Sequence, residues 1–285
     1  MKKLLLCITE QNKYIDLIKY SYHLAQYINT DLELVLIRQS SFQSADISAI
    51  EAYNLVLPFI PMDETENEVA GRFVKDLFTT NDIDFSAFSL SEYGDLFDIL
   101  DKKLRHGEFG MLVLPRTEDE VYWPYEASHL QIIAELKCPI WLIDPFAEFK
   151  PFEKVIYASN YSKLDEQMIN RFVHLTNKKI GTIELAHVSY TNSFQDKIFA
   201  LGFESYLNKQ LQDIRVKVTY LPAVASQVKI HEVFLMYAHQ NKADLIVILK
   251  QDKSFIENLV YSSFTKKALI HVQCPVFILH ERIIR

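Results

Sequence analysis

Glycine is scarce in this chain, with six among 285 residues: Gly71, Gly94, Gly107, Gly110, Gly181 and Gly202. Loops that cradle phosphates need closely spaced glycines, because backbone N–H groups must approach the phosphate without a Cβ in the way. The nearest approach to such a motif, Gly107-x-x-Gly110, precedes an apolar run and does not follow one, which is the wrong context for a cradle. The sequence therefore lacks a Walker loop and a dinucleotide-binding fingerprint.

Cysteine is also rare. Cys7, Cys138 and Cys274 are an odd number, and no two of them are close in sequence. This spacing offers neither a disulfide framework nor a Cys-x-x-Cys metal or redox motif. We expect all three to be small buried hydrophobic residues in a reducing compartment.

Basic charge and long apolar runs are lacking as well. The formal net charge is −7, whereas nucleic-acid binding needs a concentrated basic surface that neutralises phosphates. No apolar run approaches the roughly 20 residues that cross a bilayer. The apolar start at residues 4–6 gives way to polar residues 9–12 before a signal peptide is complete. We expect a soluble, cytoplasmic protein with no nucleic-acid partner and no membrane partner.

The usual motifs of enzymes and metal sites are missing too. The nine histidines form no His-Glu-x-x-His pattern, and His231 and His239 lie eight apart in one predicted helix. There is no Gly-x-Ser-x-Gly elbow of a serine hydrolase and no His-x-Gly-His loop of a Rossmann-like nucleotidyltransferase. We therefore expect no metal centre, no catalytic residues and no enzymatic activity.

The chain does contain an internal repeat, in which one unit occurs twice. Residues 136–143 and 272–279 each carry a Cys-Pro pair that leads into an apolar strand, and residues 3–9 match 154–160 in the same way. A length of 285 residues suits two domains of roughly 140 each. We predict a first domain at 1–144, a linker at 145–151 that contains two prolines, and a second domain at 152–285.

Short apolar runs alternate with helical patterns in both halves, which predicts a parallel sheet flanked by helices. Strands are expected near 3–8, 32–37, 83–90, 110–114 and 139–143, and again near 154–159, 181–188, 215–221, 244–249 and 275–280. Helical spacing recurs at Leu17, Ile18, Leu24, Ala25 and Ile28, and at Leu164, Met168, Phe172 and Leu175. Each half is thus predicted to be a five-stranded, doubly wound α/β domain. Residues 39–61 have no counterpart in the second half, and both a lid and a simple insertion remain open.

The second half carries the clearest resemblance to a known family. Residues 243–247, 263–271 and 274–276 resemble the signature of the universal stress proteins, and residues 94–100 and 110–114 resemble a first, weaker copy. The resemblance implies two tandem Rossmann-like domains of the adenine nucleotide alpha hydrolase-like type. It also implies that the last strands, near 140–143 and 276–279, pair antiparallel to form an internal pseudo-dimer. Further association into a homodimer is left open.

The resemblance fails at the ATP site. In members of the family that bind ATP, a loop of pattern Gly-x2-Gly-x9-Gly-(Ser/Thr) follows the fourth strand, and an Asp ends the first strand. Here the four loop positions in the second half are Leu249, Asp252, Ser262 and Ser263. The corresponding loop of the first half begins with Pro115, at the position of the first glycine. The Asp positions are Thr9 and Asn160. The resemblance therefore implies a stress-response protein that acts on unidentified protein partners or a small ligand, with no cofactor and without the usual binding of ATP.

An alternative reading is an atypical nucleotide-binding regulator or a weak ATPase. Its binding residues would be Asn160, Lys250, Lys253, Ser262 and Ser263. The two serines can be read as the N-cap of the last helix or as part of an anion site with the lysines. The missing loop glycines favour the stress-response protein without ATP over the nucleotide-binding regulator.

Overall fold

The computed structural model describes residues 3–9, 15–38, 79, 88–93, 96–116, 135–190, 194–222, 230–250 and 272–281. The strands of the first half are β1 (Lys3–Thr9), β2 (Leu32–Arg38), β3 (Phe88–Tyr93), β4 (Phe109–Pro115) and β5 (Ile140–Ile143). Those of the second half are β6 (Phe152–Ala158), β7 (Ile180–Ser189), β8 (Arg215–Pro222), β9 (Leu245–Lys250) and β10 (Val276–His280). The helices are α1 (Ile15–Tyr27), α4 (Leu96–Arg105), α6 (Lys163–Leu175), α7 (Phe194–Gln210) and α8 (Ile230–Gln240). The insertion at 39–61 lies outside the described residues.

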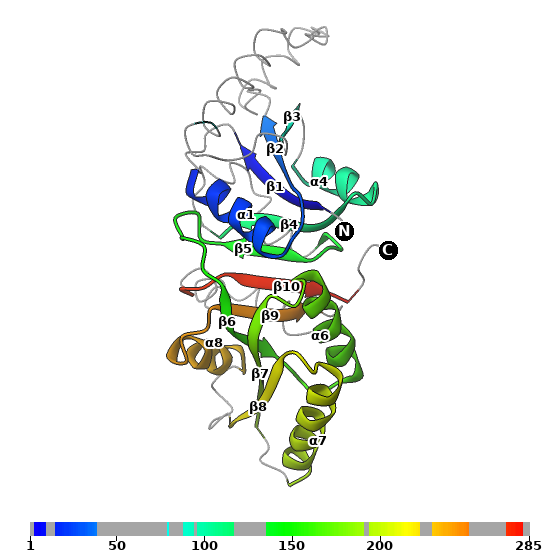
Figure 1. The fold of residues 1–285 in the computed structure, drawn as a ribbon, viewed down its shortest axis with the longest axis vertical. Coiled ribbons are helices and arrows are strands. Elements are labelled where there is room, and N and C mark those ends of the chain that lie inside the picture. The colour runs from blue at the N-terminus through cyan, green and yellow to red at the C-terminus, as the bar shows by residue number, and fades with distance from the viewer. Residues whose placement is uncertain are drawn as a thin grey trace, which may run out of the picture.

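All ten strands form one sheet, in the order β3-β2-β1-β4-β5-β10-β9-β6-β7-β8 (Figure 1). Every neighbouring pair is parallel except β5 and β10, which run antiparallel with Phe277 opposite Trp141. The predicted α/β fold with a mainly parallel sheet is confirmed. The predicted antiparallel pairing of the last strands is confirmed by this register.

Strand β3 departs from its predicted position. The sequence predicted a strand near 83–90, whereas β3 runs on to Tyr93 and residues 83–87 lie outside the described part of the chain. Residues 88–91 alternate apolar and polar residue types, which is the pattern of a strand with one face toward the core. β3 is the edge strand of the sheet, so it lacks the continuous apolar run that identified the central strands.

Two hydrophobic cores cover the two faces of the sheet. One contains buried side chains of α1, α6 and α7, and the other contains those of α4 and α8. Each core includes residues from both halves of the chain. The central strands β4, β5, β9 and β10 are buried almost throughout, as expected for strands covered on both faces.

Aromatic rings join the two halves at the middle of the sheet. The ring centroids of Trp141 and Phe277 are 4.2 Å apart, and Trp141 also stacks on Phe152 at 5.5 Å. Phe149, in the predicted linker, contacts Tyr20 of α1 at 5.4 Å and Phe152 at 5.9 Å. The segment between the halves is therefore anchored to the core, while the exact domain boundaries stay a prediction.

Two of the scarce glycines have structural explanations that involve no phosphate. Gly107 has a φ of 78° in the turn between α4 and β4, a left-handed conformation that favours glycine. A Cβ on Gly181 would lie 2.4 Å from the backbone oxygen of Glu153, so the close approach of β7 to β6 requires glycine there.

Candidate functional site

The candidate site is the carboxyl edge of the second-half sheet, between β6 and β9. The chain runs outward from β6 through β7 to β8 and then returns to place β9 on the other side of β6. Ligands of open α/β sheets bind at such a switch point, beyond the carboxyl ends of the strands. Asn160 and Lys250 each follow the last paired residues, Tyr157 and Val247, by three positions. These two predicted residues therefore lie at the same edge of the sheet. The other predicted binding residues, Lys253, Ser262 and Ser263, lie outside the described residues.

A buried carboxylate, Asp165, organises the loop between β6 and α6. It accepts hydrogen bonds from the hydroxyl groups of Tyr157 and Ser159, both at 3.1 Å, and from the backbone N–H groups of Asn160 and Ser162, both at 3.0 Å. In return, the backbone N–H of Asp165 donates to Ser162 Oγ at 3.1 Å, which completes a capping box at the start of α6. The loop is thus held by its own side chains.

The same contacts occupy the N–H groups that an anion would need. The backbone N–H groups of Asn160, Tyr161 and Ser162 all donate to side chains of this loop, namely Asp165 and Ser159. An anion-binding loop points several such groups at its ligand. The loop after β6 therefore does not present a preformed cradle for a phosphate.

Asn160 itself is engaged in the local turn. Its Oδ1 accepts from the backbone N–H of Ser162 at 3.2 Å, which forms an Asx turn. The side chain is uncharged, and the residue is exposed. Asn160 therefore serves the loop conformation and adds no charge to the edge of the sheet.

An aromatic side chain that the sequence analysis missed covers this edge. Tyr161 has a φ of 59°, unusual for a residue other than glycine. Its ring lies 4.5 Å from that of His187 on β7 and 5.9 Å from that of Phe203 on α7. Its hydroxyl is buried and has no hydrogen-bond partner among the described residues, and burial raises its pKa above the ordinary value. The ring thus fills the space beside the ends of β6 and β7. The signal in the sequence was a large aromatic residue directly after the position of the nucleotide-binding Asp.

Lys250 is less accessible than the sequence suggested. It is the last residue of β9, its side chain is buried, and it pairs with His280 of β10 in the sheet. Its backbone oxygen accepts from the N–H of Glu281 at 3.0 Å. A buried lysine within the sheet is poorly placed to meet a ligand that arrives from solvent.

Arg116 occupies the corresponding place in the first half, directly after β4. Its Nη1 donates to the backbone oxygen of Cys274 at 2.5 Å, and its Nη2 lies 3.9 Å from Asp144. Within the described residues, Nε and Nη2 have no hydrogen-bond partner, and burial lowers the pKa of the guanidinium group. Arg116 links the two halves, because it reaches from β4 to the segment before β10. The Asp-equivalent residue of this half, Thr9, ends β1.

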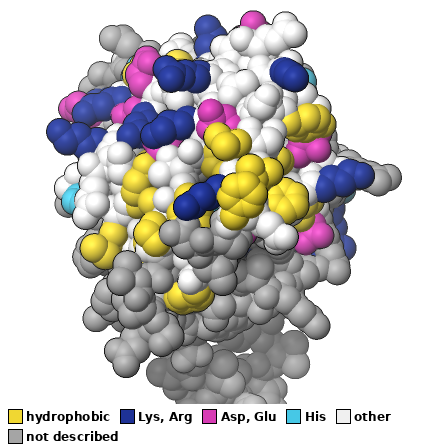
Figure 2. All heavy atoms as spheres, turned by 90° about the horizontal axis from the view of Figure 1, so that it is seen from below, with side chains coloured by type: hydrophobic (Ala, Val, Ile, Leu, Met, Phe, Trp, Pro, Cys, Tyr) yellow, Lys and Arg dark blue, Asp and Glu magenta, His cyan; other side chains and the backbone are white. Residues whose placement is uncertain are grey.

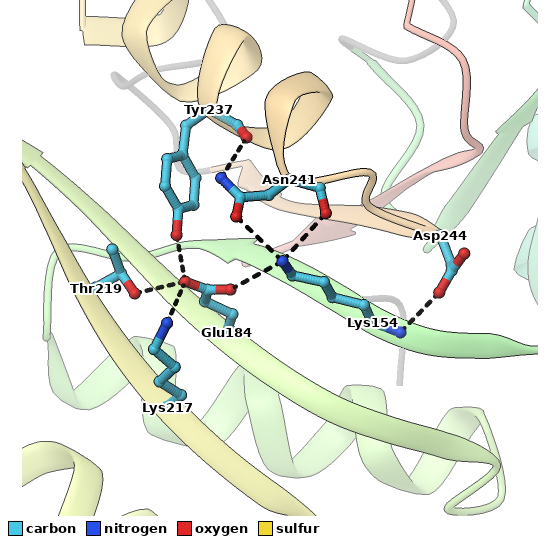
Figure 3. A network of polar contacts seen from close by, with 7 residues as sticks. All are labelled: Lys154, Glu184, Lys217, Thr219, Tyr237, Asn241 and Asp244. Atoms are coloured by element: carbon cyan, nitrogen blue, oxygen red, sulfur yellow. Dashed lines mark hydrogen bonds and ion pairs between the residues drawn. The ribbon is translucent and has the colours of Figure 1, made fainter.

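A second polar cluster, centred on Glu184, lies away from this edge (Figure 3). Glu184 of β7 is 3% exposed, and it accepts hydrogen bonds from Thr219, Tyr237 and Lys217. Lys154 lies 3.6 Å from its other oxygen. Burial alone raises the pKa of Glu184, but the hydrogen bonds from Thr219, Tyr237 and Lys217 outweigh it and hold the pKa below its ordinary value.

The position of the cluster explains its role. Lys154 near the start of β6 binds Asn241 after α8, and its backbone N–H donates to Asp244 just before β9. These residues lie at the amino ends of β6 and β9, opposite to the edge that carries Asn160. The cluster therefore ties α8 to the sheet and is not part of the candidate site. A charged residue within the apolar run of β7 was the signal for it in the sequence.

Other reactive groups are not gathered near this site in the described part of the chain. No group of three His, Cys, Asp or Glu side chains there could hold a metal ion. All three cysteines are unpaired, and burial raises the pKa values of Cys7 and Cys138 to about 12. Among the described helices, none is both long enough and apolar enough to span a bilayer.

Comparisons with known proteins agree on the family and the fold. Residues 151–280 match the model of the universal stress protein family. The chain superposes on a universal stress protein of Archaeoglobus fulgidus with a TM-score of 0.64 and 13% identity, covering 97% of this chain and 96% of that one. A putative universal stress protein of Pseudomonas aeruginosa gives a TM-score of 0.56 and 10% identity over 98% and 93%. Among curated proteins, no sequence matches. At these identities the structural likeness establishes the fold alone.

Proposed function

Because residues 151–280 belong to the universal stress protein family, we propose that the chain is a stress-response protein that works by binding a protein partner or a small ligand. It is not an enzyme, it has no resident cofactor, and it does not bind ATP in the usual way of the family. Its two domains form an internal pseudo-dimer across β5 and β10. The three unpaired cysteines fit a reducing compartment such as the cytoplasm.

The observation that carries the proposal is the closed loop after β6. Three successive N–H groups, of Asn160, Tyr161 and Ser162, already donate to Asp165 and Ser159. A phosphate that took up these groups would have to break two hydrogen bonds to the buried carboxylate of Asp165, each of which contributes about 1.5–3 kcal/mol, and one to the hydroxyl of Ser159. The carboxylate would also remain nearby as a repelling charge.

The ring of Tyr161 supports the same conclusion. It lies against His187 and Phe203 at the carboxyl edge, where a ligand of an open α/β sheet normally binds. A ligand at this position would have to displace the ring and expose the aromatic surface beneath it.

One observation favours the second candidate, an atypical nucleotide-binding regulator or weak ATPase. Asn160 and Lys250 follow neighbouring strands and share an edge, so a lysine that left its buried position would approach the loop after β6. Lys253, Ser262 and Ser263 would complete such a site. The burial of Lys250 weighs against it.

Thermal melting with and without excess ATP, ADP and magnesium tests the choice. A ligand that binds only the native state adds about 2.7 kcal/mol at a hundredfold excess over its Kd. The proposal predicts no shift in the melting temperature with any nucleotide. A clear upward shift that disappears in Lys253→Gln would overturn it in favour of the nucleotide-binding regulator.

A further inference from the structure

Several large apolar side chains of α7 are exposed. Phe194, Ile198, Phe199 and Leu201 are between 52% and 77% exposed, whereas Leu207 is the buried residue of the helix. Hydrophobic side chains gather on the surface at this end of the molecule, with basic side chains beside them (Figure 2). A contiguous apolar patch on a protein surface marks an interaction site.

The inward side of α7 closes the edge of the sheet. The side-chain amide of Asn208 donates to the backbone oxygen of Val216 at 2.8 Å and accepts from its N–H at 2.9 Å. Glu204 accepts from the N–H of Val218 at 2.8 Å. These bonds occupy the outer edge of β8, which is the last strand of the sheet. A partner therefore cannot extend the sheet at these residues and must contact the helix.

Gly202 lies at the middle of the exposed face. At 100° per residue, Ile198 and Tyr206 lie one turn before and one turn after it on the same side. Apart from the helix's own backbone, a Cβ at position 202 would meet no atom of the described residues within 4 Å, so packing within the described part of the chain does not require glycine there. Glycine inside a helix costs about 1 kcal/mol relative to alanine. Its presence here suits the close approach of another backbone.

We propose that α7 is the contact surface of a homodimer, in which two copies of the helix pack antiparallel about a two-fold axis at Gly202. This arrangement places Ile198 opposite Tyr206 of the second copy and Gln195 opposite Lys209. The surface is self-complementary, as a two-fold interface must be.

Charge and area both fit a second copy of the chain. The helix carries two acids, Asp196 and Glu204, and two bases, Lys197 and Lys209. It is thus neutral although the chain carries −7, and two copies do not repel each other there. The exposed apolar side chains provide on the order of 600 Å² per copy, given 150–250 Å² for each aromatic residue. With flanking polar residues, the contact approaches the roughly 800 Å² per partner of a stable interface.

The oligomeric state tests the proposal. The full chain should sediment at twice its mass of 33.3 kDa at about 100 µM, a concentration that populates a dimer of micromolar Kd. Ile198→Glu should weaken the dimer at least tenfold, whereas Met236→Glu, at an exposed apolar position on α8, should leave it intact. A wild-type chain that stays at 33.3 kDa overturns the proposal and points to a different partner for α7. A dimer that survives Ile198→Glu overturns it as well.

A cross-linking experiment locates the axis independently. A cysteine at position 202 would face its own counterpart, so Gly202→Cys should form a disulfide-linked dimer on mild oxidation. The matched variant Met236→Cys should not. Equal cross-linking of both variants, or none with Gly202→Cys, would place the contact elsewhere.

Discussion

At the scale of single residues, Asp165 is the group on which the candidate site depends most. It is 2% exposed and accepts four hydrogen bonds, two from side chains and two from the backbone of the loop after β6. A buried charge with this many donors is stable only while they stay in place. The loop and the start of α6 therefore form one rigid unit.

We predict that Asp165→Asn destabilises the chain by about 3 kcal/mol, because buried donors lose a charged acceptor. Urea denaturation followed by circular dichroism measures the change. Asp213→Asn is the matched control, because Asp213 is 70% exposed in its ion pair with Lys178 and should matter little. Equal effects of the two substitutions would show that the network does not support the loop.

Glu184 makes the stability depend on pH. Its pKa in the folded chain lies below its ordinary value, so the carboxylate stabilises the fold above the unfolded pKa of about 4.3, and this contribution is lost as the pH falls through the folded value. We predict that Glu184→Gln is less stable than the wild type at neutral pH and that the difference shrinks below about pH 4. Denaturation at several pH values measures this difference. A gap that stays constant down to the acid limit would contradict the prediction.

Part of this residue-scale picture could be predicted from the sequence. The family pattern pointed to Asn160 and Lys250, and the Ser162-x-x-Asp165 spacing could have been read as a capping box. The positions of Tyr161 and Arg116 could not be predicted in this way. The contacts of their side chains, with His187 and with the backbone of Cys274, join residues far apart in the chain, and no local pattern specifies them.

At the scale of elements, the pair β5 and β10 joins the two halves. Each strand alone would leave an open edge, and their pairing covers both. The central strands could be located from the sequence because burial on both faces produces unbroken apolar runs. β3, at the edge, could be located only approximately, because its alternating pattern is a weaker signal than such a run.

We predict that Phe277→Ala lowers the free energy of unfolding by about 4 kcal/mol, since a buried aromatic side chain leaves a cavity. Its ring contacts Trp141 of the other half at 4.2 Å and Phe172 of α6 at 5.6 Å. Chemical denaturation gives the change, and Phe146→Ala, at a residue 72% exposed, serves as the control. A cost near zero would mean that the halves do not share this core.

At the scale of the whole molecule, the chain keeps the scaffold of universal stress proteins, while the described loop after β6 keeps its N–H groups bonded to its own side chains. One continuous sheet and two hydrophobic cores are shared between the halves. Among the described residues, the exposed apolar side chains of α7 form the clearest candidate contact surface. This arrangement suits a protein that works by association more than one that processes a nucleotide.

Hydrogen exchange of the full chain, with and without magnesium and excess ATP, tests this account most directly. The amides of Asn160, Tyr161 and Ser162 are hydrogen-bonded within their own loop, so we predict slow exchange there without ligand and no change anywhere in the chain on addition of ATP. Rapid exchange of these three amides without ligand would contradict the closed loop, and new protection of them when ATP is added would show that the loop meets a nucleotide.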